Sequence, residues 1–325
     1  MAVSAEQRPL LFALRALFLG DFLVAVPAYR ALRRAFPEHE VRLATTAGVA
    51  PLAALTDAID SVAPARGPDD FSAPSREVDL AVNLHGRGPQ STAALRALRP
   101  QRLWSFDLAD DAEPSPPWDE RWPGHERERW CELLAGYGIS ADPIDYRLRT
   151  PEVRPPAHDA TVIHPGAAFA ARRWPARRHA EVARALRRAG HDVVITGARS
   201  ELRLATAVAE LAGLSPSAVF AGKTDVLGLA ALIAHAQLVV CGDTGPAHLA
   251  TAYATSSVVL FGPTPPTRWG PPSEPRHVTL WTRTDSAIGD PRGDRPDPAL
   301  LAIEVADVLR GVERVLAERA DVLAG

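Results

Sequence analysis

The sequence predicts an α/β protein built from two Rossmann-like domains, each with a mostly parallel sheet between layers of helices. Three observations support this fold class. Short apolar strands alternate with helical segments along the chain. A proline-rich stretch at 142–159 has no apolar period and separates two such series. The 325 residues, 46% of them apolar, suffice for two packed domains.

The expected boundaries follow from that linker. We expect an N-terminal domain over residues 1–153 and a C-terminal domain over residues 154–300, facing each other across a central cleft. Residues 301–325 are expected to form a C-terminal helix, and the sequence leaves open whether this helix packs back on the N-terminal domain.

The first series of elements is predicted in regular alternation. Strands are expected at 10–19, 40–46, 78–84 and 102–106, with a short apolar stretch at 60–64. Helices are expected at 22–36, 51–59, 91–98 and 125–139. The segment 107–124 is rich in proline, aspartate and tryptophan, which predicts a surface loop.

The second series is clearer. Strands are expected at 160–166, 191–197, 218–222, 236–242, 257–262 and 277–281, and helices at 177–190, 200–211, 226–236 and 245–254. A polar loop at 282–298 and one or two helices at 299–320 close the chain. Each strand ends at a glycine or a short polar loop, which places several loops along one sheet edge. Open α/β sheets bind their ligands at that edge.

Charge and composition exclude several classes of function. The formal net charge of −3 argues against a nucleic-acid-binding surface. Cys131 and Cys241 have no metal-binding or redox spacing, which fits a reducing cytosol. Arg15 interrupts the first apolar run and Asp21 ends it, so neither a signal peptide nor a membrane span is predicted there. We therefore expect a soluble, cytoplasmic protein.

The stretch from Gly242 to Ala252, GDTGPAHLATA, lies between two buried-strand patterns. A strand that ends in such a turn, followed by a helix, directs free amides at Thr244 and Gly245 toward an anion such as a diphosphate. Asp243 would be repelled by phosphate and suits the hydroxyl groups of an attached sugar. The pattern therefore points to a nucleotide sugar, while helix capping remains the simpler alternative.

Asp21 stands where the first strand turns into the first helix. As a general base it would take a proton from an acceptor hydroxyl, without an extreme pKa if the proton leaves late in the reaction. The alternative is a helix cap. The turn NLHGRGPQS offers His85, Arg87 and Gln90 to an acceptor, or is simply polar.

The strand-end loop that begins at Gly166 leads to Arg172 and Arg173. Adjacent arginines can neutralise a leaving diphosphate, and plain surface charge is the alternative.

Two later turns offer further polar groups. Glu201 falls in the first turn of a helix, where it can hold a ribose or be favoured by the helix dipole alone. The turn AGKTD carries Lys223 and Thr224 but lacks P-loop spacing.

Taken together, these segments resemble glycosyltransferase family 9, the heptosyltransferase family of the GT-B fold. The resemblance rests on GDFLVAVPAYRALRRAFP, VDLAVNLHG, HPGAAFAARRWPARRHAEVARAL and the segment from GKTDVLGLAALIAHA to FGPTPPTRWGP. It spans nearly the whole chain, and the last block is the most specific.

The resemblance implies roles for particular residues. Asp21 matches the proposed catalytic base of the family. Thr244 and Gly245 match its diphosphate-binding turn, and Asp243 matches the carboxylate that contacts sugar hydroxyls. His248 falls on the histidine of the motif, although a partly buried helix residue is the alternative.

Two further positions, Arg172 and Glu201, also correspond to residues of the family. Arg172 stands where members commonly carry a lysine, so the geometry of the phosphate contact differs. Glu201 matches an acidic residue that holds the nucleotide ribose. Many members carry a cysteine-rich segment before the final helix, whereas this chain has 284–305, TDSAIGDPRGDRPDPALLAIEV.

The function implied is an inverting, metal-independent glycosyltransferase. It would move heptose or a similar sugar from a nucleotide-diphosphate donor, ADP-linked by preference, without a cofactor. The acceptor is a glycan, a lipid-linked or a small molecule, which leaves peripheral membrane contact open. The alternatives are a GT-B epimerase or hydrolase of nucleotide sugars and a non-catalytic nucleotide-sugar-binding protein. No G-x-G-x-x-G closes the first strand, which disfavours an oxidoreductase.

Overall fold

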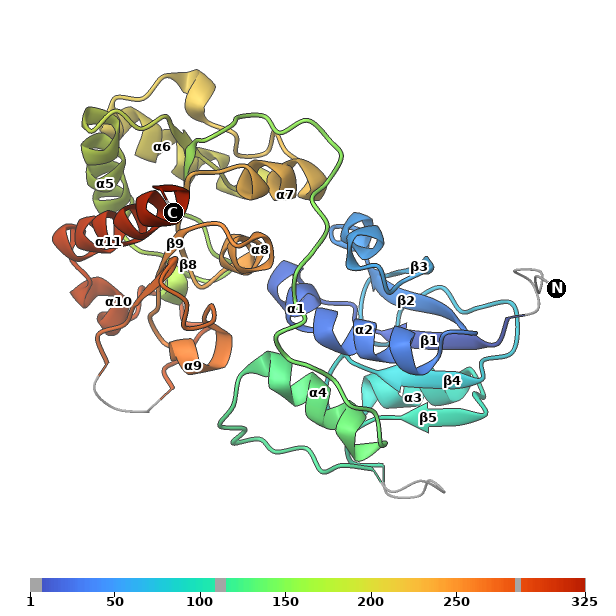
Figure 1. Cartoon of the computed structure of the whole chain (residues 1–325). Coiled ribbons are helices and arrows are strands. Elements are labelled where there is room, and N and C mark those ends of the chain that lie inside the picture. The colour runs from blue at the N-terminus through green and yellow to red at the C-terminus, as the bar shows by residue number, and fades with distance from the viewer. Residues whose placement is uncertain (1–7, 109–114, 284–287, 325) are drawn as a thin grey trace. The chain divides into compact units, whose positions relative to one another are not determined.

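The computed structural model of the chain describes residues 8–108, 115–283 and 288–324. Two loops expected from the sequence, 107–124 and 282–298, are therefore described only in part. The chain divides into two compact units, which meet in sequence at Arg149 and Thr150. Each unit contains a sheet of five strands whose neighbouring strands are all parallel (Figure 1).

The first unit alternates strands and helices as the sequence predicts. Its strands are β1 (Leu10–Leu14), β2 (Glu40–Thr46), β3 (Ser61–Ala65), β4 (Leu80–Asn83) and β5 (Arg102–Trp104). Its helices are α1 (Leu19–Val24), α2 (Val26–Ala35), α3 (Gln90–Ala97) and α4 (Glu126–Gly136), with a 3-10 helix η2 (Ala50–Thr56). The sheet order β3-β2-β1-β4-β5 follows that of Rossmann dinucleotide-binding sheets.

The strand expected at 10–19 is shorter in the structure. The Arg15 amide still donates to the Ala44 carbonyl at 2.9 Å, as in a strand. The Arg15 carbonyl, however, accepts from the Thr45 hydroxyl at 2.9 Å. The ladder therefore ends at Leu14, and residues 15–18 form the loop that leads into α1.

Two predicted helices of this unit also differ. The helix expected at 22–36 is the pair α1 and α2, because Pro27 has no N–H group to continue the first helix. The helix expected at 51–59 is the 3-10 helix η2, which ends at Thr56 and is followed by Asp57 in the left-handed conformation, with φ at 57°.

The second unit repeats the alternation with a different strand order. Its strands are β6 (Thr161–His164), β7 (Val193–Ile195), β8 (Leu238–Gly242), β9 (Ser257–Leu260) and β10 (His277–Leu280). Its α-helices are α5 (Ala176–Arg188), α6 (Leu202–Ala212), α7 (Val226–Ala234), α8 (Gly245–Tyr253), α9 (Pro266–Trp269), α10 (Pro298–Ala302) and α11 (Val305–Ala324). Three 3-10 helices complete it: η3 (Ala170–Arg172), η4 (Arg199–Glu201) and η5 (Pro216–Ala218). The order β10-β9-β8-β6-β7 is that of flavodoxin-like sheets.

The strand expected at 218–222 does not form. Val219 makes only an isolated parallel bridge to Ile195. The chain is in the 3-10 helix η5 just before it, and Gly222 turns the backbone just after it with φ at +70°. These two bends leave no room for a ladder.

The C-terminal segment forms two helices and belongs to the second unit. The carboxylate of Asp297 caps α10 by accepting from the Ala299 amide at 2.8 Å. Helix α11 packs against α5, β9 and β10. Its side chains Val308, Val312 and Val315 are buried in the core of this unit.

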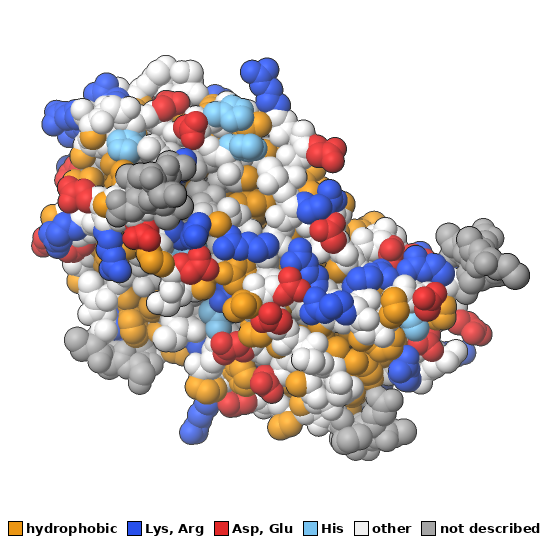
Figure 2. Space-filling model, in the orientation of Figure 1, with side chains coloured by type: hydrophobic (Ala, Val, Ile, Leu, Met, Phe, Trp, Pro, Cys, Tyr) orange, Lys and Arg blue, Asp and Glu red, His pale blue; other side chains and the backbone are white. Residues whose placement is uncertain are grey.

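Each unit has its own apolar core. All residues of β1, β4, β6, β8 and β9 are buried, as expected for parallel strands with helices on both faces. On the face shown in Figure 2, cationic and anionic side chains are interspersed rather than gathered in one field of a single sign.

Candidate active site

Each sheet reverses its strand order at one place. The reversal lies between β1 and β4 in the first unit and between β6 and β8 in the second. Loops leaving the carboxyl ends of the two strands diverge there, and open α/β sheets bind ligands at such points. In the first unit these loops carry Asp21 and His85. In the second they carry Gly166 and the turn 243–245.

Asp21 lies in the first turn of α1, and its side chain is 29% exposed. It is not the N-cap of this helix, which is Phe18. A carboxylate in the first turn of a helix is also favoured by the helix dipole. Burial raises the pKa of Asp21 above its usual value, while the positive charge of Arg15 lowers it and Glu126 raises it. A half-buried carboxylate with a raised pKa suits a general base.

His85 follows β4 and lies beside the same loop. The Ala16 amide donates to Nδ1 of His85 at 3.2 Å, so the proton of the ring is on Nε2. Burial and the charge of Arg15 lower the pKa of His85 to about 4. The imidazole is therefore neutral near pH 7 and offers one N–H donor to an acceptor oxygen.

The other two candidate acceptor residues lie farther out. Arg87 is exposed and pairs with Asp107 at 3.3 Å and with Glu120. Gln90 is exposed at the first position of α3. Arg87 thus lies in a polar turn, where its guanidinium pairs with two carboxylates.

Asn83, which the sequence did not single out, organises the loop after β4. Its amide nitrogen lies within 3.0–3.1 Å of the Gly86 carbonyl and of the hydroxyls of Ser91, Thr92 and Ser105. Its carbonyl oxygen accepts from the His85 amide at 3.1 Å. Because Asn83 is fully buried, this network fixes the backbone that carries His85.

The second unit places the turn GDTG between the end of β8 and the start of α8. Thr244 is the N-cap of α8 by position, but its hydroxyl donates to the Gly242 carbonyl at 3.2 Å and makes no cap hydrogen bond. The first-turn amides of α8, beginning at Gly245, thus lack a side-chain cap and are suited to an anion. Asp243 is buried beside this turn, and its amide donates to the Leu260 carbonyl at 3.2 Å.

His248 lies one turn into α8 and is 8% exposed. Its ring meets the ring of Trp269 edge to face, with centroids 5.9 Å apart. Trp269 belongs to the short helix α9, in a segment for which the sequence predicted no helix. His248 is therefore a buried residue of α8 whose ring contacts that of Trp269.

The two adjacent arginines have different surroundings. Arg172 is half-buried, and its Nη1 donates to the carbonyl of Asp243 at 3.3 Å. Arg173 is exposed, and its Nε donates to the Ala167 carbonyl of its own loop at 2.9 Å. A β-carbon on Gly242 would lie 3.2 Å from the Arg172 carbonyl, so the segment 170–172 lies close against the end of β8. The structure thus brings Arg172 to the GDTG turn.

Glu201 and Gly166 are in direct contact. A β-carbon on Gly166 would lie 2.2 Å from Oε1 of Glu201, so no larger residue fits there while the carboxylate keeps its place. Oε2 of Glu201 accepts from the Ala198 amide at 2.8 Å and lies 3.9 Å from Nε2 of His164. Burial lowers the pKa of His164, and the negative charge of Glu201 opposes that shift. The carboxylate is therefore held at the carboxyl end of β6.

Lys223 and Thr224 lie on the turn into α7. The Gly222 amide donates to the Gly197 carbonyl at 2.9 Å, which ties this turn to the end of β7. Lys223 is exposed and is the only lysine among the 325 residues, although the chain has 36 lysines and arginines together. An ammonium group is thus placed at the same sheet edge as the carboxylate of Glu201.

The sequence missed Arg15, which the structure places at the centre of the first unit's loops. Arg15 is 1% exposed, and its Nη2 lies 3.8 Å from Oδ1 of Asp21. Its only sequence signal is a cation directly after a fully apolar strand, which a surface turn would also show.

The carboxyl edge of the second sheet can therefore bind a ligand that is both anionic and rich in hydroxyls. A helix N-terminus, a guanidinium and an ammonium provide positive charge. Glu201 and Asp243 are acceptors for hydroxyl groups.

Comparison with known proteins identifies the family. The model of glycosyltransferase family 9 (heptosyltransferase) matches residues 128–290, which is half of the chain. The chain belongs to glycosyltransferase family 9. The matched segment contains every candidate residue of the second unit, whereas Asp21 and His85 lie outside it.

A curated relative of this family 9 chain is lipopolysaccharide heptosyltransferase 3 of Escherichia coli. It is 33% identical over 159 residues, which cover 48% of this chain and 46% of the relative. The match thus spans about half the length of that protein.

Solved structures show the fold over nearly the full length. A glycosyl transferase family 9 protein from Veillonella parvula superposes with a TM-score of 0.80 at 20% identity, covering 98% of this chain and 99% of that one. The ADP-heptose lps heptosyltransferase II of E. coli superposes with a TM-score of 0.76 at 20% identity, covering 95% and 99%. The family 9 chain has the GT-B fold of these proteins, with its two parallel five-stranded sheets.

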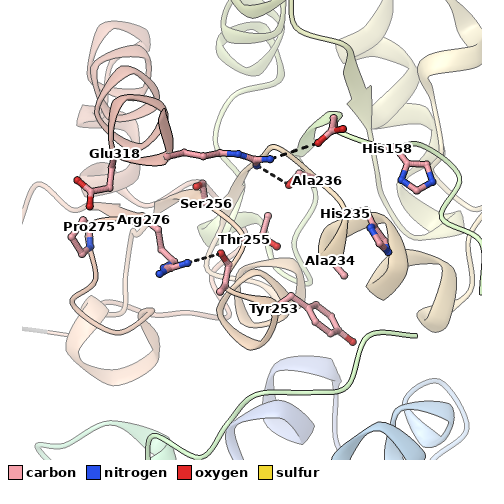
Figure 3. Close-up of a pocket in the computed structure, with 13 residues that line it drawn as sticks. His158, Ala234, His235, Ala236, Tyr253, Thr255, Ser256, Pro275, Arg276 and Glu318 are labelled. Carbon is pink, nitrogen blue, oxygen red and sulfur yellow. Dashed lines mark hydrogen bonds and ion pairs between the residues drawn. The ribbon is translucent and has the colours of Figure 1, made fainter. Parts of the chain in front are cut away.

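A separate cavity of about 410 Å³ lies in the second unit of the family 9 chain, where several of its strands begin rather than end. In Figure 3, His158 and His235 lie on one side of it and Arg276 and Glu318 on the other. Arg276 donates to the Ala254 carbonyl at 3.3 Å. Neither Asp243 nor Glu201 lines this cavity, so it is distinct from the candidate site.

Within the described parts of this family 9 chain, no helix is both long enough and apolar enough to span a bilayer.

Proposed function

We propose that this family 9 protein is an inverting glycosyltransferase that moves a heptose or similar sugar from ADP-heptose or a related donor to an acceptor hydroxyl. The observation that carries the proposal is the second switch point. There the uncapped start of α8, Arg172 and the carboxylate of Glu201 lie at one sheet edge. A nucleoside diphosphate sugar presents the matching groups, namely two phosphates and the hydroxyls of ribose and sugar.

In this proposal the second unit binds the donor. The amides at Thr244 and Gly245 and the guanidinium of Arg172 bind the diphosphate. Glu201 accepts from the ribose hydroxyls, and Asp243 accepts from hydroxyls of the sugar. The choice of ADP-heptose is supported by the name of the structurally similar E. coli protein, an ADP-heptose lps heptosyltransferase.

Further contacts are proposed around that core. Gly166 leaves room for Glu201, Lys223 and Thr224 approach the outer part of the nucleotide, and His248 supports the turn from within α8. Arg173, which points along its own loop, adds positive charge near the phosphates.

The first unit would hold the acceptor. Asp21 takes the proton of the acceptor hydroxyl as its oxygen bonds to the anomeric carbon. The bond from that carbon to the β-phosphate breaks, and the electron pair leaves with ADP. Positive groups around the diphosphate stabilise the leaving charge without a metal ion. Displacement from the opposite face inverts the anomeric centre.

The acceptor is proposed to contact the turn that follows β4. His85, as a neutral donor, suits a sugar oxygen, while Arg87 and Gln90 lie at the outer end of the same turn. The curated relative acts in lipopolysaccharide synthesis according to its name, which suggests a lipopolysaccharide core oligosaccharide as the first acceptor to try.

Donor binding can be tested through the single lysine. An amine-reactive reagent has only Lys223 and the terminal amine to modify, and peptide mass spectrometry separates the two. We expect saturating ADP to slow modification of Lys223 and to leave the terminal amine unchanged. Arg172→Met should weaken this protection, whereas Arg178→Met should not, because Arg178 binds the Leu301 and Ile303 carbonyls. Equal labelling of Lys223 with and without ADP would refute the donor site.

The role of Asp21 can be tested by substitution. With ADP-heptose and core oligosaccharides, Asp21→Asn and Asp21→Ala should lower kcat by about 100-fold or more, because general base catalysis contributes that much. Calorimetric ADP affinity should be unchanged. Asp70→Asn is the control, since that exposed carboxylate pairs with Arg66. Near-normal turnover of Asp21→Asn would remove Asp21 from the base role.

The same assays separate the alternatives. Isomerisation or hydrolysis of ADP-heptose without an acceptor would indicate an epimerase or hydrolase. Saturable ADP binding without turnover on any acceptor would indicate a binding protein.

A further inference from the structure

Among the described residues, Arg15 is the largest fully buried side chain, with 1% of its surface exposed. A guanidinium keeps its charge at any physiological pH, so burying one is costly unless anions and hydrogen-bond acceptors surround it. Among the described residues, the only carboxylate within 4.0 Å of Arg15 is that of Asp21, at 3.8 Å. The buried charge therefore depends on a residue proposed for the chemistry.

The guanidinium joins the two loops of the first switch point. Its Nε donates to the backbone carbonyl of Asp21, and its Nη1 donates to the carbonyl of Leu84. One side chain thus holds both the first turn of α1, which carries Asp21, and the loop that carries His85.

The position of Arg15 is itself fixed from two sides. The Arg15 amide donates to Ala44, and the Arg15 carbonyl accepts from Thr45, so β2 anchors the backbone. The guanidinium carbon lies 4.4 Å from the ring centroid of Trp130 in α4, in cation–π geometry. A side chain held in this way has little rotamer freedom left.

We propose that Arg15 is a positioning residue for Asp21: it holds the Asp21 backbone and carboxylate in place and supplies the positive charge that keeps the carboxylate ionised for an incoming hydroxyl. The role of Asp21 in this inference rests on the proposed function. The contacts of Arg15 are observed in the structure and do not depend on that function. Arg15 acts through Asp21 and is not itself placed against the reacting atoms.

Three groups face this pair from the surrounding elements. Glu126 of α4 and Tyr29 of α2 interact electrostatically with Asp21, and Tyr29 and His85 interact with Arg15. Tyr29 and His85 are both neutral near pH 7, since burial raises the pKa of the phenol and lowers that of the imidazole. Arg15 is therefore the cation that partly opposes the effects of burial and of Glu126 on the pKa of Asp21.

The direct experiment measures the titration of Asp21 in the full chain. With ¹³C-labelled aspartate, the Asp21 carboxyl signal is the one missing from Asp21→Asn. In Arg15→Met the pKa of Asp21 should rise by about 1 or more, because an opposite charge at this distance lowers a carboxyl pKa by that amount. Arg15→Lys keeps the charge, so the pKa should stay near the wild-type value.

Arg102→Met is the matched control. Arg102 also pairs with an aspartate, Asp79 at 2.8 Å, and also lies over aromatic rings, Phe36 and Trp104. Its removal should change the titration of Asp79 and leave that of Asp21 unchanged. An Asp21 pKa that is the same in Arg15→Met and wild type would overturn the electrostatic half of the proposal.

Measurements of kcat test the other part of the proposal, namely that Arg15 holds Asp21 in position. Arg15→Lys cannot reproduce the guanidinium fork, so kcat should fall by about 10- to 100-fold while ADP affinity stays the same. In Arg15→Met the acid limb of the kcat/KM profile should also move to higher pH. Wild-type kcat in Arg15→Lys would refute positioning even if Arg15→Met does not fold. Failure of wild-type transfer would instead refute the proposed function, and the titration would still decide the role of Arg15.

Discussion

At the scale of single residues, the second switch point contains a close contact between Gly166 and the carboxylate of Glu201. The carboxylate of Glu201 occupies the position that a side chain on residue 166 would fill. A glycine is therefore required at position 166 because the Glu201 carboxylate lies so close to its backbone. A left-handed backbone, the other common reason for a glycine, does not occur at this position. In this position the carboxylate accepts from the Ala198 amide at 2.8 Å.

Gly166→Ala should damage this arrangement. The new methyl group forces the Glu201 carboxylate to move, which we expect to lower the free energy of unfolding by about 1–3 kcal/mol and to weaken ADP binding. Urea unfolding and calorimetry measure the two effects. Gly48→Ala is the control, because nothing lies within 4 Å of a β-carbon there. ADP affinity of Gly166→Ala equal to wild type would argue against Glu201 as a nucleotide contact.

A double variant separates packing from binding. Gly166→Ala with Glu201→Ala removes the clash, so stability should recover while ADP binding stays weak. Recovery of both would assign the defect to packing alone.

At the scale of elements, helix α5 shows how burial of one histidine links stability to pH. His179 is 1% exposed on the buried face of α5, and its ring meets Trp174 edge to face at 5.0 Å. Burial, with a smaller effect of His164, lowers the pKa of His179 to about 3. The folded state therefore resists protonation of this ring.

The sign of the pH effect follows from linkage. As pH falls from about 6.5 to about 3, the unfolded chain binds a proton at His179 before the folded chain does, so stability falls. His179→Phe keeps the ring but cannot titrate. We compare the unfolding free energy of the variant with that of wild type at pH 7.5 and at pH 4. Between these two pH values the difference should shift in favour of the variant by roughly 3 kcal/mol.

Urea unfolding at the two pH values measures this difference. His158→Phe is the control, because His158 is exposed. If the unfolding free energies of wild type and His179→Phe depend on pH in the same way, the conclusion that the folded state holds His179 in its neutral form is wrong.

At the scale of the whole molecule, the chain consists of two units with separate cores. The core cluster of the second unit contains β-strand residues together with Val308, Val312 and Val315 of α11. Every candidate residue for the donor lies in this unit, and Asp21 lies in the other. Donor binding and base catalysis are thus assigned to different units in the proposal.

Residues 150–325 alone are expected to fold and to bind ADP with an affinity close to that of the full chain. The reason is that their core and all proposed donor contacts lie within that range. Cooperative urea unfolding, calorimetry with ADP and protection of Lys223 measure this. The fragment should not transfer sugar, because it lacks Asp21. A fragment without cooperative unfolding would show that the second unit depends on the first.

The alternation of strands and helices, the parallel sheets and the glycine turns at strand ends were predictable from sequence, because each depends on residues a few positions apart. Two predictions made from such local patterns were wrong: the strand at 218–222 and the unbroken helix at 22–36. There, Gly222 and Pro27 outweighed the apolar pattern around them.

The sequence by itself determined the GT-B class, the family and the position of the GDTG turn, since local patterns contain that information. Tertiary structure decided what surrounds the chemical groups. Arg15 meets Leu84 from 69 residues away, and Arg172 meets Asp243 from 71 residues away. Such contacts depend on which strands are neighbours in each sheet, and strand order is fixed by packing of the whole unit rather than by any local period.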